Sequence, residues 1–235
     1  MATQFATQFD RIKILIGDTA INRLKKAKIL LFGLGGVGGY VAEALVRTGV
    51  GHIDLVDKDV VDITNLNRQI IATTDTIGKN KTEVMRDRLL SINKECDINI
   101  YNLFYVNNDD NIIDFKKYDY VVDCIDNITG KISIIEECKN ANVNIISSMG
   151  SGNRTNPSCF KVADINDTKV CPLAKVMRQE LRKRSIDNVK VVYSDEMPAE
   201  HKIENTNDVI GSFCAVVGTC GFMIAQEVIK DILYT

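Results

Sequence analysis

Residues 28–57 decide the fold, and they read KILLFGLGGVGGYVAEALVRTGVGHIDLVD. The apolar run Lys28–Phe32 at the start is typical of a buried strand. Tyr40–Thr48 carries apolar residues at helical spacing, and Gly49 follows it in the place of a C-cap. A second apolar run, His52–Val56, comes next. Strand, glycine loop, helix and strand in this order predict a βαβ unit with two parallel strands.

The loop after the first strand contains the pattern G-x-G-x-x-G, formed by Gly33, Gly35 and Gly38. Such a loop turns tightly, lets a ligand approach the backbone, and presents a helix N-terminus whose free N–H groups favour phosphate. Asp57 lies nineteen residues after Gly38, where a carboxylate meets ribose hydroxyls. The motif predicts a nucleotide site in this context. A glycine-rich packing turn without a ligand is the alternative.

Helices and strands are expected to alternate to about residue 150, after which the pattern changes. The first part is expected to continue with helices at Lys79–Asn93 and Ile128–Asn140 and strands at Asp97–Leu103, Tyr118–Ile125 and Val143–Ile146. The second part is expected to hold strands at Phe160–Ile165 and Val189–Val192, a helix at Pro172–Arg184 and a long terminal helix at Val209–Ile232. The predicted fold class is α/β: a doubly wound, Rossmann-like, mostly parallel sheet with a C-terminal extension of strands and helices on the same sheet.

The composition is that of an ordinary globular protein, since 45% of the 235 residues are apolar and 26% are charged. A formal net charge of −2 excludes a strongly basic nucleic-acid binder but leaves room for a local basic patch. The predicted helix Pro172–Arg184 carries such a patch, and a solvated outer face is the alternative. Its basic residues are Lys175, Arg178, Arg182, Lys183 and Arg184.

The seven cysteines show no C-x-x-C spacing, so neither a zinc site nor a redox motif is predicted. We expect free thiols in a reducing cytoplasm. Val209–Ala225 is almost free of charge, but it is too short for a membrane span and contains three glycines. A buried core or interface helix is therefore expected there, with no membrane association.

An unusual polar stretch follows Asp57 and includes Asp59, Asn65, Asn67, Arg68 and Gln69. A guanidinium binds phosphate with several donors in one plane, so Arg68 is a candidate phosphate ligand. The two asparagines could clamp ribose, phosphate or backbone. A nicotinamide oxidoreductase would need little of this stretch, and a solvated loop is the other alternative.

Two lysines, Lys79 and Lys81, open the helix expected at Lys79–Asn93. Cations in a first turn oppose the helix dipole by about 0.3–1 kcal/mol each. An anion held by the helix and Lys81 would remove this conflict, so Lys81 is a candidate phosphate ligand. The alternative is that both side chains point into water.

Two carboxylates, Asp123 and Asp126, stand at the end of the strand expected at Tyr118–Ile125. Ligands of open α/β sheets bind outside the carboxyl ends of the strands. Asp126 is therefore a candidate Mg²⁺ ligand, because Mg²⁺ takes one or two protein carboxylates together with phosphate oxygens. Asp123 is expected to be a buried group paired with the backbone or a loop.

Four motifs together resemble the ubiquitin-activating-type adenylating enzymes: G-x-G-G-V-G at 33–38, D-x-D-x-V-x-x-x-N-x-N-R-Q at 57–69, G-x-x-K at 78–81 and D-C-x-D-N at 123–127. The resemblance implies an enzyme that binds ATP and Mg²⁺ and transfers AMP to a carboxylate. It implies a nucleotide-binding set made of Gly33, Gly35, Gly36, Gly38, Asp57, Asp59, Asn65, Asn67, Arg68, Gln69, Lys81 and Asn127. Catalytic roles fall to Arg68, Lys81, Asp126 and Arg11, with Asp126 on the metal. Arg11 would reach across a homodimer to the ATP of the partner.

Three further stretches resemble the tRNA threonylcarbamoyladenosine dehydratases within this superfamily: SMGSGN at 148–153, PLAKVMR at 172–178 and KVVYS at 190–194. The resemblance implies ATP-dependent dehydration, a cyclisation, of threonylcarbamoyladenosine beside the anticodon of tRNA, through adenylation of the threonyl carboxylate. It implies a cytoplasmic homodimer that binds tRNA, and it leaves open a cysteine desulfurase or sulfur-acceptor partner. Residues 1–150 would bind ATP, and residues 151–235 would bind substrate and form the dimer, as one continuous domain.

Three other functions stay open from the sequence. The first is an adenylyltransferase for the C-terminal glycine of a ubiquitin-like sulfur-carrier protein. The second is a nicotinamide-dependent oxidoreductase, against which Arg68 and Lys81 argue. The third is a non-catalytic scaffold. The presence of all the polar candidate residues named above argues against it.

Overall fold

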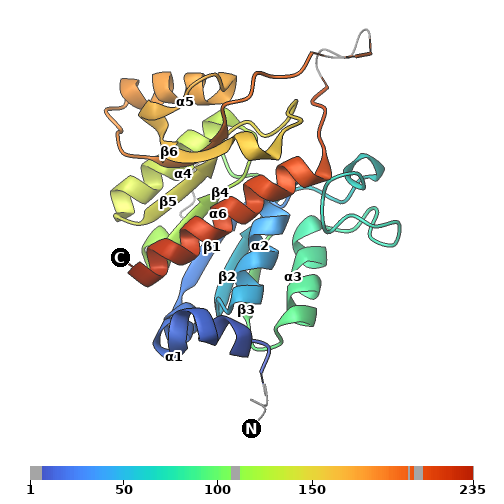
Figure 1. Cartoon of the computed structure of the whole chain (residues 1–235), viewed down its shortest axis with the longest axis vertical. Helices are drawn as coiled ribbons and strands as arrows, with labels where there is room; N and C mark the ends of the chain where they lie inside the picture. Colours follow the sequence, from blue (N-terminus) through green and yellow to red (C-terminus); the bar gives the residue numbers. More distant parts are fainter. Residues whose placement is uncertain (1–6, 107–111, 201, 204–208, 235) are drawn as a thin grey trace.

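The computed structural model describes residues 7–106, 112–200, 202–203 and 209–234, and over these residues the chain forms a single seven-stranded sheet flanked by helices (Figure 1). The strand order is β3-β2-β1-β4-β5-β7-β6. The strands are β1 (Lys28–Phe32), β2 (His52–Val56), β3 (Asp97–Tyr101), β4 (Tyr120–Asp123), β5 (Asn144–Ser148), β6 (Phe160–Asp164) and β7 (Lys190–Ser194). All neighbouring pairs are parallel except β6 and β7, which are antiparallel at one edge.

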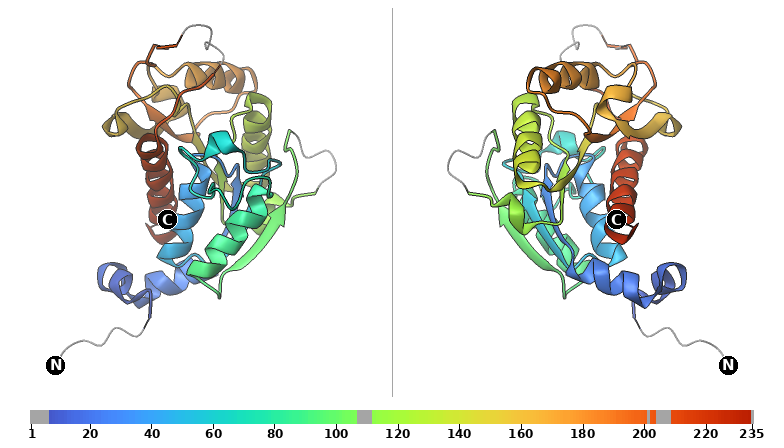
Figure 2. Two further views of the ribbon diagram at one scale, coloured as in Figure 1. Left: turned by 90° about the vertical axis from the view of Figure 1, so that its right-hand side faces the viewer. Right: turned by 90° about the vertical axis from the view of Figure 1, so that its left-hand side faces the viewer.

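Helices cover both faces of the sheet, as the side views of Figure 2 show. They are α1 (Asp10–Lys26), α2 (Gly38–Thr48), α3 (Lys81–Ile92), α4 (Ile128–Ala141), α5 (Pro172–Lys183) and α6 (Cys214–Tyr234). One apolar core joins the sheet to α1, α2, α3 and α6, and a second core joins the other face to α4 and α5. The chain therefore has the α/β fold with a doubly wound, mostly parallel sheet that the sequence predicts.

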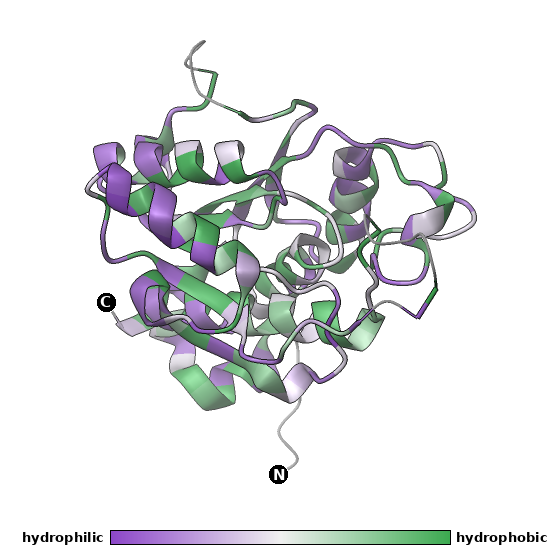
Figure 3. Cartoon of the chain, turned by 90° about the horizontal axis from the view of Figure 1, so that it is seen from above, coloured by the Kyte–Doolittle hydropathy of each residue, from purple (hydrophilic) through white to green (hydrophobic). Residues whose placement is uncertain are grey.

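The βαβ unit forms as predicted, and local geometry explains its boundaries. Lys28–Phe32 pairs in parallel with His52–Val56, one residue opposite the next. Helix α2 ends where Gly49 adopts φ 104°, a left-handed conformation that favours glycine, and the Gly49 amide donates to the Val46 carbonyl. Seen from above, the hydropathy of the helices alternates between apolar and polar, as expected for elements with one buried side (Figure 3).

Several expected boundaries differ from the structure. The terminal helix begins at Cys214 rather than Val209, because Gly211 exchanges two hydrogen bonds with Asn153 instead of continuing a helix. Helix α3 begins at Lys81 rather than Lys79, because the Lys79 carbonyl accepts a hydrogen bond from the Val61 amide. The strand expected at Tyr118–Ile125 is shortened to β4, and the other expected elements form with shifts at their ends.

The sequence did not predict α1. Only two of its apolar residues, Ile21 and Leu24, are buried, and Gly17 breaks its helical backbone with φ 79° and ψ 168°. A helix with so few buried positions and a kink leaves little periodic signal.

The charge-free stretch Val209–Ala225 contributes to the core, as expected. Val216, Cys220 and Ile224 of α6 lie in the core that α6 shares with α2. A Cβ at Gly221 would lie 2.6 Å from the Val37 carbonyl oxygen, so this glycine permits the close approach of α6 and α2. None of the helices in the described ranges is both long enough and apolar enough to cross a membrane.

Candidate functional site

A cavity of about 730 Å³ opens where the parallel strands β1, β2, β4 and β5 end. Its walls come from the loops that follow these strands and from segments of the second half of the chain. The carboxyl edge of an open α/β sheet is the place where ligands bind in such folds. The lining residues of the first half are Phe32, Gly33, 35–37, 56–59, Asn65, Arg68, Gln69, Lys81, 103–105 and 124–127, and those of the second half are 148–154, 171–173, Pro198, Ile210, Ser212 and Val217.

The glycine loop packs tightly and leaves its backbone open to the cavity. Gly33 has φ 84°, and a Cβ there would lie 2.8 Å from the carbonyl carbon and oxygen of Cys124. A Cβ at Gly38 would overlap the carbonyl oxygen of Gly33. These two glycines let the helix pack closely against the strand ends, and Gly33, Gly35 and Gly36 line the cavity. Gly38 does not line the cavity.

Asp57 ties the glycine loop to the end of β2. Its carboxylate accepts hydrogen bonds from the amides of Leu34, at 2.6 Å, and of Asp59, at 2.8 Å. Burial raises the pKa of this carboxyl group, although the charge of Lys81 and the two amides act against the rise. The ribose role of Asp57 stays a prediction, and in this structure the side chain also shapes the loop.

Lys81 is the buried cation of the site. The residue is 5% exposed, and its Nζ lies 2.9 Å from Oδ2 of Asp59. Asp59 therefore supplies an anion beside the lysine at the start of α3, where the sequence predicts an anionic ligand. Lys79 is exposed, which agrees with the alternative reading of that lysine.

The polar stretch 65–69 divides between the cavity and local structure. Arg68 lines the cavity and donates from Nη1 to the Thr64 carbonyl at 2.8 Å and to Oδ1 of Asn67 at 3.0 Å. Asn67 does not line the cavity, because its amide donates to the carbonyl of Ser212. Asn65 lines it, but its Oδ1 accepts from the Asp62 amide in a capping box. Of the three partners considered for the two asparagines, their side chains thus hydrogen-bond to backbone groups.

Gln69 presents a buried acceptor that the protein does not use. The residue is 6% exposed and lines the cavity, and its Oε1 has no hydrogen-bond partner among the described residues. Leaving a buried polar atom unpaired costs about 1–3 kcal/mol, so a ligand that donates to this oxygen would stabilise the site.

The two carboxylates after β4 have different surroundings. Asp126 is exposed and lines the cavity, whereas Asp123 is fully buried and pairs with Nζ of Lys131 at 3.0 Å. Asn127 also lines the cavity, and its side chain accepts from the Gly130 amide as the N-cap of α4. No group of three or more possible metal ligands occurs within the described residues, so a cation on Asp126 would need oxygen atoms from a ligand or water.

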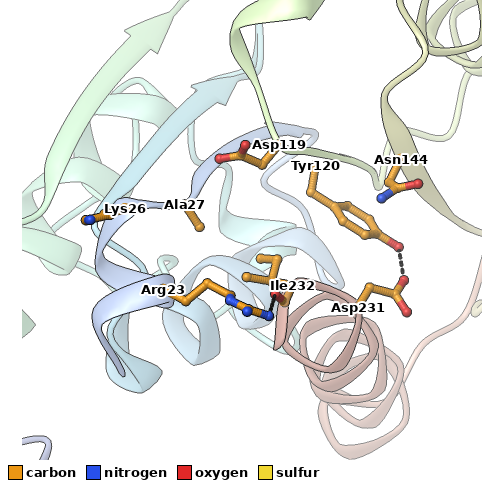
Figure 4. Close-up of a pocket in the computed structure, with 8 residues that line it drawn as sticks. All are labelled: Arg23, Lys26, Ala27, Asp119, Tyr120, Asn144, Asp231 and Ile232. Carbon is orange, nitrogen blue, oxygen red and sulfur yellow. Dashed lines mark hydrogen bonds between the residues drawn. The ribbon is translucent and has the colours of Figure 1, made fainter. Parts of the chain in front are cut away.

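Arg11 lies outside the cavity, on the exposed surface of α1. A second hollow, of about 430 Å³, lies near this helix at the amino ends of β4 and β5 (Figure 4). There Arg23 donates to the Leu233 carbonyl at 2.6 Å, and the Tyr120 hydroxyl donates to Asp231 at 2.7 Å. These contacts fasten α1 and the sheet to the end of α6.

The basic patch of α5 is partly used within the chain. Arg178 donates to both oxygens of Thr168, and Arg184 pairs with Glu136 and Glu180. Lys175 and Arg182 stay exposed. Intramolecular pairing thus takes up part of the positive charge of the predicted basic patch.

Sequence reasoning missed Arg154, which lines the cavity with 3% of the residue exposed. It also missed Leu103, Phe104 and Tyr105, which follow β3 and line the cavity as well. Arg154 stands in a glycine-rich connection without periodicity, so the sequence carried no signal for its burial.

The chain matches one family over nearly its whole length. The chain belongs to the ThiF family, whose pattern matches residues 9–235. It is 39% identical over 242 residues to the tRNA threonylcarbamoyladenosine dehydratase of Bacillus subtilis strain 168, with 96% of this chain and 94% of the relative covered. A dehydratase of the same name from Haemophilus influenzae is 41% identical over 181 residues, covering 76% of this chain and 69% of the relative.

Solved structures of the Escherichia coli tRNA N6-threonylcarbamoyladenosine dehydratase show the same fold. The complex of that protein with AMP superimposes with a TM-score of 0.89 at 33% identity, covering 96% of this chain and 94% of the other. Its complex with ATP gives a TM-score of 0.88 at 33% identity, covering 96% and 93%.

Proposed function

We propose that this protein dehydrates threonylcarbamoyladenosine in tRNA at the expense of ATP, by adenylating the threonyl carboxylate. The observation that carries the proposal is the cavity at the carboxyl edge of the sheet, which combines a glycine loop, Arg68 and Lys81 from the first half of the chain with a wall from the second half. The match to dehydratases over almost the full length of both chains supports it, as do the ATP and AMP complexes of the Escherichia coli relative. A tRNA substrate is consistent with a cytoplasmic enzyme.

The first-half residues of the cavity suit a triphosphate. Gly35 and Gly36 offer backbone without side chains, and Arg68 and Lys81 provide positive charge beside them. We assign the ribose to Asp57, and the unpaired Gln69 Oε1 is available to a ligand donor. The remaining predicted ligands are Gly33, Gly38, Asp59, Asn65, Asn67 and Asn127, which support the loops around the ligand.

A carboxylate is a poor electrophile at neutral pH, so it must be activated before another group can attack it. A carboxylate oxygen attacks the α-phosphorus of ATP, the bond to the bridging oxygen breaks, and pyrophosphate leaves. Negative charge grows on the phosphate oxygens, where the guanidinium of Arg68 and the ammonium of Lys81 stabilise it. The tethered carbamoyl group then attacks the activated carbonyl and expels AMP, which carries away one carboxylate oxygen. Because this second step is intramolecular, it needs no covalent cysteine.

Asp126 would hold Mg²⁺ in this proposal. Its exposed carboxylate on the cavity wall fits a cation that completes its shell with phosphate oxygens and water. When bound, Mg²⁺ supplies positive charge that neutralises the phosphates.

We assign residues 1–150 to ATP binding and residues 151–235 to substrate binding and dimerisation, within one continuous sheet. Helix α1 supports a homodimer, because it exposes Ile14 and Leu15 to 69% and 83%. In such a dimer Arg11 would serve the ATP of the partner. A cysteine desulfurase or sulfur acceptor would be a further partner.

One reaction tests the proposal. The purified protein is incubated with ATP, Mg²⁺ and tRNA that carries threonylcarbamoyladenosine. The tRNA is then digested, and the masses of its nucleosides are measured by mass spectrometry. We expect loss of one water from the modified nucleoside, only with ATP, together with release of AMP and pyrophosphate. An unchanged nucleoside, with ATP–pyrophosphate exchange that instead depends on a protein ending in Gly-Gly, would assign the chain to sulfur-carrier adenylation.

A further inference from the structure

Arg154 is a buried cation that the adenylation mechanism does not use. The residue is 3% exposed and lines the cavity, and its Nε and Nη1 have no hydrogen-bond partner among the described residues. Burying guanidinium N–H groups without acceptors is costly, and the cost persists only where something else supplies the acceptors. The side chain is therefore prepared for an anionic ligand.

The backbone around Arg154 is fixed on both sides. On one side, the Asn153 amide donates to the Gly211 carbonyl at 2.7 Å, and the Asn153 carbonyl accepts from the Ala199 amide at 2.8 Å. On the other side, the Thr155 amide donates to both carboxylate oxygens of Glu196 at 3.1 Å. Hydrogen bonds with Gly211, Ala199 and Glu196 thus fix the backbone on both sides of this arginine. A fixed backbone reduces the entropy that is lost when a ligand binds.

Glu196, an acid whose ionisation the charge of Arg154 favours, already accepts other hydrogen bonds. Besides Thr155, its Oε2 accepts from the Asn156 amide at 3.1 Å. Partial burial opposes ionisation, yet these hydrogen bonds and the charge of Arg154 hold the pKa of Glu196 below its usual range. Neither Nε nor Nη1 of Arg154 reaches this carboxylate, so two donors stay available to a ligand.

Arg154 comes from the second half of the chain, whereas Arg68 and Lys81, the cations assigned to the phosphates, come from the first half. Its neighbours in the chain, Gly150–Asn153, line the cavity with Ile210 and Ser212. A Cβ at Gly152 would overlap Ile210, so these two segments stack directly on each other. Arg68 and Lys81 come from the first half and already provide cations for a triphosphate.

We propose that Arg154 binds the carboxylate of the acceptor before AMP is transferred to it, and thereby selects substrates that carry a free carboxylate. This inference rests on the function proposed above. A planar guanidinium can hold a carboxylate through two N–H groups, which fixes its orientation as well as its place. Orientation matters because the attacking oxygen must lie in line with the phosphorus and the leaving pyrophosphate. Arg154 is thus a substrate-binding residue, and the phosphate charge falls to Arg68 and Lys81.

The test compares two tRNAs that differ in the carboxylate. One carries threonylcarbamoyladenosine, and the other carries the same group with its carboxylate converted to the primary amide. We expect the wild-type protein to bind the first about tenfold or more tightly, on the scale of a charge-assisted pair. Arg154→Ala and Arg154→Gln should bind both tRNAs equally, and Arg154→Lys should keep part of the preference because it keeps the charge. ATP affinity, measured without tRNA, should not change.

The controls separate the possible failures. Arg86→Ala, a half-buried arginine of α3 that pairs with Asp87 and does not line the cavity, should behave as the wild type, and melting curves should show that Arg154→Gln folds. A preference that survives in Arg154→Ala overturns the inference while leaving the proposed function standing. A tenfold loss of ATP affinity in Arg154→Gln assigns the guanidinium to the phosphates, which also overturns it. If the wild-type protein neither prefers nor converts the tRNA with the free carboxylate, the proposed function and this inference are refuted together.

Discussion

At the scale of single residues, the site is built from charges that the fold has already paired. Lys81 is buried against Asp59, and Asp57 is held by two backbone amides. Preorganised charges of this kind need no rearrangement when negative charge develops on a phosphate. A buried ammonium is also more effective than an exposed one, because water screens it less.

Substituting Lys81 should therefore impair chemistry more than folding. We expect Lys81→Ala to lower turnover and ATP–pyrophosphate exchange by about 10²-fold or more, on the scale of a lost transition-state donor. The matched control is Lys79→Ala, two residues earlier and exposed, which should leave both rates unchanged. Near-normal exchange in Lys81→Ala would remove the role assigned to this lysine, and Arg68→Ala tests Arg68 in the same way.

At the scale of elements, polar and apolar contacts lock α2 to its neighbours and so hold the glycine loop in place. Glu43 of α2 is buried and pairs with Arg88 of α3 and with Arg47, the latter at 2.8 Å. On another side of α2, Gly221 lets α6 approach closely. Movement of α2 would shift the glycine loop, which leads from β1 into the N-terminus of this helix.

The Glu43 pair should make stability depend on pH. Although burial opposes the charged form, Arg88 and Arg47 hold the pKa of Glu43 below its ordinary value. The ionised form is thus favoured by folding, so its stabilisation is complete above the unfolded pKa of about 4.3 and is lost as pH falls through the lower folded pKa. We expect Glu43→Gln to reduce the free energy of unfolding by about 1–2 kcal/mol at pH 7, and to match the wild type at low pH.

Urea unfolding at several pH values measures this difference. Glu83→Gln on α3 is the control, since no ion pair of Glu83 occurs among the described residues. A Glu43→Gln deficit that stays constant down to the lowest pH would show that packing, and not the ion pair, is responsible.

The glycines of α6 provide a second prediction at this scale. A Cβ at Gly221 would lie 2.6 Å from the Val37 carbonyl oxygen and 2.8 Å from the Cβ of Tyr40, whereas a Cβ at Gly218 would meet only the Tyr40 ring at 3.5 Å. Gly221→Ala should therefore destabilise the protein by about 1–3 kcal/mol through overpacking. Gly218→Ala should be neutral or slightly stabilising, because alanine favours a helix. Equal melting temperatures of the two variants would contradict this account.

At the scale of the whole molecule, the cavity and α1 lie at opposite ends of the sheet (Figure 1). Arg11 can therefore assist an ATP site only in a second copy of the chain. The apolar residues that α1 exposes are consistent with such a contact.

A mixture of two inactive variants tests this arrangement. Arg11→Ala keeps an intact cavity but lacks the donated arginine, and Lys81→Ala lacks the lysine but can donate Arg11. Each variant alone should have little activity. After equal mixing and subunit exchange, about a quarter of the sites should be complete, because half of the dimers are mixed and each holds one complete site. Activity that does not rise on mixing, although mixed dimers form, would contradict a role for Arg11 across the interface.

The βαβ unit, the glycine loop, and the positions of Asp57 and Asp126 after their strands could all be predicted from the order of residues alone. These features are local: apolar runs set the strands, glycines set the turn, and parallel strands bring their carboxyl ends to one edge. Lys81 was found as well, because a cation at the start of a helix conflicts with the dipole.

The charged side chains that pair with the site residues could be identified only from the folded structure. Asp59 neutralises Lys81, and Lys131 neutralises Asp123, through contacts across 22 and 8 residues of chain. Arg154 reaches the cavity because residues 150–154 pack on residues 210–212, far away in sequence and without periodicity. Burial and pairing of charge depend on how distant segments meet, and no local pattern of residues records that meeting.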